Sequence, residues 1–142
     1  MKKMMMISAF FAAITVSAFA QKIDAAKVPV AVKTAFAKQY PGVAAKWEKE
    51  AGMFEAGFKE KGHAMSALYD AGGMMKESEM EIKIADLPAS VAKYVNENYK
   101  GKKIKESAKI TKADGTVNYE AEVSGKDLIF DANGKFIKAV KD

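Results

Sequence analysis

Side chains that commonly carry out catalysis or bind metals are scarce in this chain of 142 residues. The chain contains one histidine, His63, and no cysteine. A structural zinc site usually has four Cys or His ligands, and nucleophilic catalysis needs a nucleophile, a base and a group that orients the base. No serine lies in a G-x-S-x-G motif, and no phosphate-binding or dinucleotide-binding loop is present. The sequence therefore predicts no enzyme, and no catalytic, cofactor or metal site.

Two weaker features are compatible with a bound metal ion. The stretch "DANG", which begins at Asp131, is a fragment of a calcium loop without the further carboxylates that such a loop needs. The methionines after residue 20 all lie in the first of two similar units, over residues 21–86: Met53, Met65, Met74, Met75 and Met80. Thioethers can bind copper, but they also fill irregular cores. A small-ligand or metal carrier that uses this methionine-rich first unit is the alternative function.

The first 20 residues have the three parts of a secretory signal peptide. Lys2 and Lys3 are followed by an uncharged apolar run, which ends in Ala18-Phe19-Ala20. We expect cleavage after Ala20 and a periplasmic or secreted protein without stable membrane insertion. The whole chain has a formal net charge of +5, with the two signs interspersed, and this mild charge does not call for a nucleic-acid partner.

The remaining chain contains one pattern twice. "VPVAVKTAFAKQYPG" (Val28–Gly42) aligns with "LPASVAKYVNENYKG" (Leu87–Gly101), and each has apolar residues four apart, as on one face of a helix. Proline near the start and glycine at the end are typical of helix boundaries. Self-similarity over about 60 residues indicates a duplicated unit. We expect a first unit over residues 21–86 and a second over residues 87–142.

After each predicted helix the apolar period changes to two. "FEAGF" (Phe54–Phe58) and "YEAEV" (Tyr119–Val123) alternate between apolar and polar or small residues, which is typical of strands with one buried face. Turn signals divide each unit into four strands, and "YDAGG" and "FDANG" are the last hairpin turns. Asp70 and Asp131 are expected to bond the turn backbone. The prediction is an α+β fold, a tandem duplication of a helix plus a four-stranded antiparallel sheet, with the helices packed on one face of the sheets.

These motifs, in this order, resemble the PepSY-like family of exported bacterial proteins, which are similar in fold to the beta-lactamase inhibitor protein. The resemblance rests on both helix motifs, on "FEAGF" and "YEAEV", and on "LYDAGG" and "LIFDANGKF". It implies two helix-plus-sheet units, a place outside the cytoplasm, and a binding or inhibitory role. It supplies no catalytic residue.

The alternation of the strands also predicts which residues lie on the sheet face away from the helices. Tyr69 and Phe130 are expected to face the helices, and Leu68 and Ile129 to face the other way. An apolar centre with a polar surround resembles a protein interface, although single exposed apolar residues are also common on ordinary surfaces. The candidate protein-contact residues are Glu55, Ser66, Leu68, Glu120, Glu122, Asp127 and Ile129.

The sequence thus favours an exported, non-enzymatic binding or regulatory protein that acts on an extracytoplasmic protein such as a peptidase. The partner is expected to be another exported protein, whose identity the sequence does not specify. If the contact does not lie on the open sheet face, the hairpin tips around Asp70, Asp114 and Asp131 are the next candidates.

Overall fold

The structure is a computed structural model in which residues 20–141 are described. The predicted signal peptide lies outside these residues, apart from Ala20. The described chain contains two α-helices and nine strands, which confirms the predicted α+β class. The strands are β1 (Gln21–Ile23), β2 (Lys46–Glu50), β3 (Met53–Glu60), β4 (His63–Tyr69), β5 (Met75–Glu81), β6 (Glu106–Lys112), β7 (Val117–Val123), β8 (Lys126–Asp131) and β9 (Phe136–Lys141).

The helices have the positions that the sequence predicts. Helix α1 spans Val30–Gln39 and α2 spans Ala89–Asn98, and a short 3-10 turn precedes each of them, at Ala25–Lys27 and Ile84–Asp86. Each α-helix begins directly after a proline, Pro29 or Pro88. The proline lies one position before the helix, where its carbonyl oxygen accepts a hydrogen bond from the first turn.

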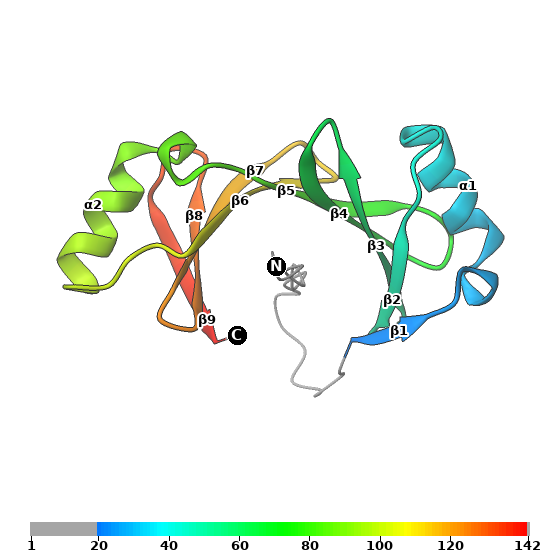
Figure 1. Ribbon diagram of the computed structural model, residues 1–142, viewed down its shortest axis with the longest axis horizontal. Helices are drawn as coiled ribbons and strands as arrows, with labels where there is room; N and C mark the ends of the chain where they lie inside the picture. The colour runs from blue at the N-terminus through cyan, green and yellow to red at the C-terminus, as the bar shows by residue number, and fades with distance from the viewer. Residues whose placement is uncertain (1–19, 142) are drawn as a thin grey trace. The chain divides into compact units, whose positions relative to one another are not determined.

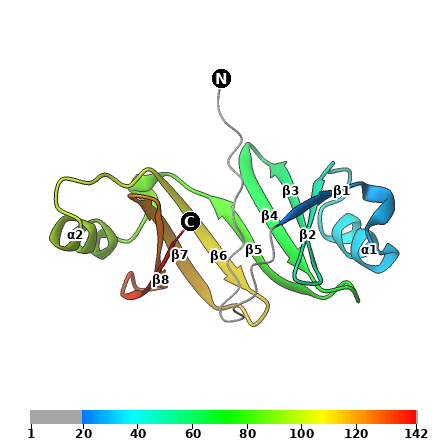
Figure 2. The same ribbon diagram turned by 90° about the horizontal axis from the view of Figure 1, so that it is seen from below.

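The hydrogen-bonded order of the strands follows their order in the sequence, from β1 to β9. The chain packs as two compact units, whose boundary in the sequence lies between Ser78 and Glu79, inside β5. We call the part up to Ser78 unit 1 and the part from Glu79 unit 2. Helix α1 is followed by β2 to β5, and α2 by β6 to β9. Figure 1 and Figure 2 show α1 beside the strands of unit 1 and α2 beside those of unit 2.

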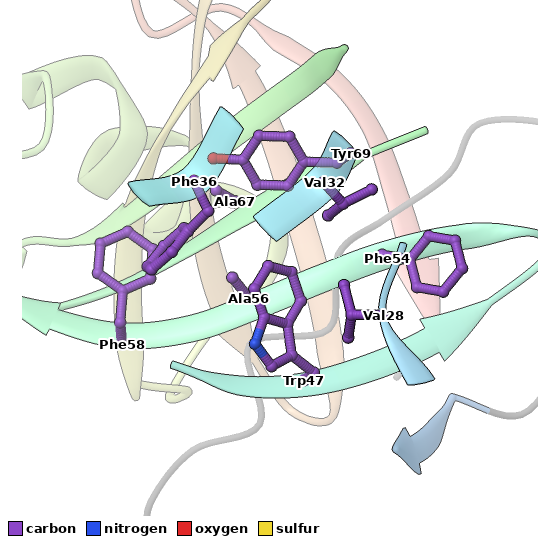
Figure 3. Packing of buried hydrophobic residues seen from close by; sticks show 9 residues of the cluster. All are labelled: Val28, Val32, Phe36, Trp47, Phe54, Ala56, Phe58, Ala67 and Tyr69. Carbon is purple, nitrogen blue, oxygen red and sulfur yellow. The ribbon is translucent and has the colours of Figure 1, made fainter. Parts of the chain in front are cut away.

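The core of unit 1 is rich in aromatic side chains. Val32 and Phe36, four residues apart on α1, are buried against the sheet together with Trp47 and Phe58. Figure 3 shows these side chains converging from the helix and from strands β2 and β3, together with Ala67 and Tyr69 from β4. The Phe36 ring centroid lies 5.5 Å from that of Trp47 and 5.0 Å from that of Phe58, both edge to face, as aromatic rings prefer.

The core of unit 2 is built from smaller side chains, with one aromatic group. Val91 and Val95 on α2 pack against Ala121, Val123 and Leu128 of the sheet. An aromatic group of Tyr94, Phe130 and Phe136 continues this core. Phe130 and its counterpart in unit 1, Tyr69, are fully buried on the helix side, which confirms their predicted orientation.

Strand β1 was not predicted. Its residues pair antiparallel with β2, from Gln21 opposite Lys49 to Ile23 opposite Trp47. A strand of three residues is too short for a period of two to be recognisable, so only the backbone pairing with β2 identifies it.

Candidate functional site

The residues considered for metal chemistry do not come together. His63 is exposed at the start of β4, opposite Glu60. Within residues 20–141, no three His, Cys, Asp or Glu side chains are grouped so that they could hold a metal ion. Met65 and Met75 pack against the core of unit 1, whereas Met74 is 61 % exposed in the turn before β5. Met65 and Met75 thus contribute to core packing, which was one of the two roles considered for the methionines, the other being metal binding.

In unit 1, the register places the predicted contact residues on one face. Glu55 lies opposite Leu68, and Ser66 lies opposite Gly57, whereas the neighbouring Ala67 belongs to the core beneath α1. The face assignment is therefore correct. The expected exposure is wrong, because Leu68 is only 5 % exposed and Ser66 only 4 %.

In unit 2 the same correction applies. Glu120 lies opposite Ile129, and Glu122 opposite Asp127, on the face away from α2. Ile129 is 3 % exposed and Asp127 is 7 % exposed. Ile129 stands between Glu120 on β7 and Lys138 on β9, and side chains in such cross-strand positions lie close enough to cover one another. An exposed apolar centre, which the interface prediction required, is therefore not present at Leu68 or Ile129.

Several carboxylates lie on this face of unit 2, beside its buried apolar residues. Glu106 on β6 lies opposite Glu122 on β7, which in turn lies opposite Asp127 on β8. Lys105 Nζ lies 3.4 Å from Glu122 Oε1. The Oε2 atom of Glu106 is buried and has no hydrogen-bond partner among the described residues. Burial raises the pKa of Glu106, and the negative charges of Glu122 and Glu81 raise it further, while Lys105 opposes them.

We expect Glu106→Gln to stabilise the protein at neutral and alkaline pH and to have less effect in acid. A carboxyl group whose pKa is raised by folding destabilises the folded state when it is charged, and protonation relieves this as the pH falls through the folded pKa. Because Glu106 is partly solvated, the gain should be small, with Tm about 2 °C higher at pH 8. Melting curves between pH 4 and pH 8 measure it. Glu97→Gln, at an exposed position on α2, is the control. A Tm difference that does not vary with pH would contradict the proposed origin.

The aspartates of the repeated turns bind their own backbone, as predicted. Asp70 Oδ1 accepts hydrogen bonds from the N–H groups of Gly72 and Met74, both at 3.0 Å. Asp131 Oδ1 accepts from those of Asn133 and Lys135 at 2.9 and 3.0 Å. The Met74 N–H is the main cause that lowers the pKa of Asp70, with the Gly72 N–H and Lys76 adding to it. These oxygen atoms are therefore engaged in holding the turns.

Each turn packs against the start of the helix of its own unit. Ser90 Oγ, on α2, donates to the carbonyl oxygens of Asn133 and Gly134, at 3.2 and 3.0 Å. In unit 1, Gly73 lies against the backbone of Ala31 on α1, so closely that a Cβ at Gly73 would lie 2.5 Å from the Ala31 carbonyl oxygen. The turn and the helix start therefore form one rigid corner in each unit.

The unit 1 corner presents exposed apolar side chains. Val30, next to Ala31, is 74 % exposed, and Met74, next to Gly73, is 61 % exposed. The corresponding residues of unit 2 are Ala89, the first residue of α2, and Lys135, which follows Gly134. We call Val30, Met74 and the Asp70 turn the unit 1 corner. The alignment of the two repeats contains this difference, but the sequence alone does not show that Val30 and Met74 flank one contact.

These observations define an α+β protein of two helix-on-sheet units, with a rigid turn at the start of each helix and without a metal-binding group of acids in the described residues. The chain belongs to the family of PepSY-like, beta-lactamase-inhibitor-like proteins, whose model matches residues 52–138. No curated protein is similar enough to count as a match.

Solved structures share this fold. A protein from Bacteroides eggerthii, described as periplasmic, is 14 % identical with a TM-score of 0.71, over 79 % of this chain and 87 % of that chain. A protein from Bacteroides uniformis is 18 % identical with a TM-score of 0.70, over 78 % and 87 %. A protein from Bacteroides fragilis, described as similar to the beta-lactamase inhibitor protein, is 24 % identical with a TM-score of 0.64, over 78 % and 84 %. Neither helix within residues 20–141 has the length and apolar character needed to cross a bilayer.

Proposed function

We propose that this chain is an exported, non-enzymatic binding protein that acts on another protein outside the cytoplasm. Three observations support the proposal. The family is named for its likeness to an inhibitor that is itself a protein-binding protein, a structure of the same fold is described as periplasmic, and the first 20 residues have the pattern of a signal peptide. Fold alone does not determine function, so the argument needs a surface on this chain.

The unit 1 corner is the surface that carries the proposal. Exposed apolar residues close to one another are a common feature of contact sites. The backbone that carries Val30 and Met74 is held by the Gly73–Ala31 contact and by the Asp70 hydrogen bonds, so little backbone entropy is lost when a partner binds. Met74 also offers an adaptable thioether, of the kind enriched at binding surfaces. Unit 2 has the same turn without these side chains, so the fold does not require them.

The test converts the unit 1 corner into the residues that unit 2 carries, with the double variant Val30→Ala and Met74→Lys. Because unit 2 tolerates alanine and lysine at these positions, the variant should fold with a nearly unchanged Tm. The partner is first captured by cross-linking in an extract of exported proteins from the native cell, and its affinity is then measured. We expect a loss of about 30-fold, as for a contact worth ~2 kcal/mol.

The control variant is Ile137→Lys, which replaces an apolar residue that is 50 % exposed on β9. It should bind the partner with wild-type affinity. Equal affinity of the double variant and the wild type would refute the unit 1 corner as the contact. If the wild type captured no saturable partner, the binding function itself would be contradicted.

Of the residues that the sequence suggested for contact, Glu55, Glu120 and Glu122 are partly exposed. That these three glutamates form an acidic part of the interface stays a prediction. The buried Ser66, Leu68, Asp127 and Ile129 do not belong to this proposal, because a partner could not reach their side chains without opening the sheet.

We also propose that the two units arose by duplication. Helices of equal length begin after Pro29 and Pro88, and each is followed by strands that end in an aspartate-stabilised turn against the helix start. The repeat boundary proposed from the sequence, at residues 86 and 87, lies just before α2. It differs from the boundary between the packed units, because β5 continues past Ser78 into unit 2.

A further inference from the structure

Unit 2 contains a hollow beside α2 that the proposed function does not use. Its volume is about 260 Å³, and it lies between the 3-10 turn, the helix and the loop that leads to β6. Ile84, Val95 and Ile104 supply apolar lining, while Asn96, Lys102 and Lys103 supply polar groups. Ile84 is 45 % exposed, which is unusual for a large apolar side chain, and Val95 is buried at 2 %.

One helix position that lines the hollow, Val95, has a larger side chain in unit 1. In unit 1, Phe36 occupies the helix position four residues before the final tyrosine, and its ring packs against Trp47 and Phe58. Figure 3 shows these three rings close together. In unit 2, Val95 occupies the same helix position, since Tyr99 N–H bonds to its carbonyl oxygen as Tyr40 N–H bonds to that of Phe36.

A position on the first strand after the helix also has a smaller side chain in unit 2 than in unit 1. Trp47 lies opposite Ala56 on β3, and the residue in the corresponding place opposite Ala121 on β7 is Ser107. Loss of aromatic volume beneath a helix leaves space unless other side chains fill it. The loop residues differ as well, because Lys102 and Lys103 correspond to Val43 and Ala44 in the first repeat. Around the hollow, unit 2 thus has a smaller side chain on the helix and two lysines in the loop.

The lining residues specify the chemistry of an occupant. Among residues 20–141, the charged residues that line the hollow are Lys102 and Lys103, and this positive charge favours an anion. The N–H of Lys102 is hydrogen-bonded to the Tyr99 carbonyl oxygen at 3.0 Å, and Ile104 packs against the core of unit 2, so both ends of this loop segment are fixed. An apolar lining with a few polar groups is typical of small-molecule sites.

We propose that this hollow binds a small aliphatic monocarboxylate, with its alkyl chain against Ile84, Val95 and Ile104 and its carboxylate at Lys102 and Lys103. At ~30 Å³ for a group the size of a water molecule, the hollow has room for about eight heavy atoms. Hexanoate has this size and serves as the probe. The site is separate from the unit 1 corner, and the proposal does not depend on the proposed protein partner.

The experiment is an NMR titration of the isotopically labelled protein with hexanoate. Saturable shifts of the Val95 and Ile104 methyl groups are expected. Acetate, which has the charge without the chain, and hexylammonium, which has the chain with the opposite charge, should cause no saturable shift there. Hexanoate without saturable shifts at these methyl groups, or hexylammonium with the same affinity as hexanoate, would overturn the proposal.

Variants test the two halves of the site separately. Val95→Phe restores the residue of unit 1 and should abolish binding by filling the hollow. Ala92→Leu, at an exposed lining position on α2, should block the site without a change in the core, and it decides the question if Val95→Phe fails to fold.

Lys102→Gln with Lys103→Gln should weaken hexanoate binding about 5-fold or more, as expected from the loss of exposed ion pairs. The control is Lys100→Gln with Lys126→Gln, which removes equal charge from exposed lysines that do not line the hollow. If the two double variants were equally affected, a general charge effect would replace the proposed site. If Ala92→Leu folded and bound hexanoate like the wild type, the hollow would be refuted.

Discussion

Phe130→Ala is expected to lower the free energy of unfolding by about 3–5 kcal/mol, the usual range for removal of a buried phenylalanine. Phe130 is fully buried, and its ring packs edge to face with Tyr94 and Phe136, at centroid distances of 5.6 and 5.8 Å. Tyr94 and Phe136 stack on each other at 4.4 Å, so they cannot both move into the space that the missing ring leaves. The lost transfer free energy and the cavity therefore both contribute.

Urea unfolding followed by far-ultraviolet circular dichroism measures this loss. Trp47 is the only tryptophan of the chain and lies in the core of unit 1, so its fluorescence reports that unit separately. We expect the transition of unit 2 to shift by the larger amount. Phe130→Leu keeps most of the apolar volume and is the matched control, with an expected loss below about 1.5 kcal/mol. A loss below about 1 kcal/mol for Phe130→Ala would show that the aromatic group does not stabilise unit 2.

Gly73→Ala is expected to destabilise unit 1 by about 2–3 kcal/mol, through backbone strain and steric conflict together. The backbone of Gly73 has a φ of +86°, which residues with a Cβ rarely adopt. The added Cβ would also lie 2.5 Å from the carbonyl oxygen and 2.9 Å from the carbonyl carbon of Ala31. These atoms belong to the first turn of α1 and cannot move without displacing the helix from the β4–β5 turn.

Gly72→Ala is a close control, because it makes the same chemical change one residue earlier in the same turn. Gly72 is not among the glycines with a positive φ, and within the described part of the chain its added Cβ would meet just Asp70 Oδ1, at 3.4 Å. This variant should change the free energy of unfolding by less than about 0.5 kcal/mol. Denaturant unfolding monitored by Trp47 fluorescence compares the two. Similar losses for both variants would mean that the turn is only loosely held against α1.

The helices, strands β2 to β9 and the turns at Asp70 and Asp131 follow from local sequence, whereas β1 does not. Val32 and Phe36 repeat with the period of a helix, and Phe54, Ala56 and Phe58 with the period of a strand, so each pattern identifies its buried side without knowledge of the rest of the fold. The turn aspartates bond to N–H groups two and four residues ahead, an interaction that depends only on nearby atoms.

Tertiary structure determines which residues are exposed on the sheet face away from the helices. The alternation places Ile129 away from α2 correctly, but its burial depends on Glu120 and Lys138, which come from two different strands. The cross-strand position of Glu106 and Glu122 likewise depends on the register of β6 and β7. Sequence gives the face of a strand residue, while register determines which side chains cover it.

The α+β class, the order of helices and strands after β1 and the lack of a recognisable catalytic motif could be derived from the sequence, because they depend on residue types and short periods. Only the tertiary structure shows that Val30 and Met74 flank one contact, because the two residues that touch, Ala31 and Gly73, lie far apart in the sequence and no local pattern links them. It also decided that Val95, Lys102 and Ile84 surround one hollow. The unit 1 corner arises where segments distant in the sequence pack together, whereas the hollow arises where the 3-10 turn, the helix and the loop of one stretch fold against each other. In both cases the packing of a whole unit, rather than a local period, sets how close these residues lie.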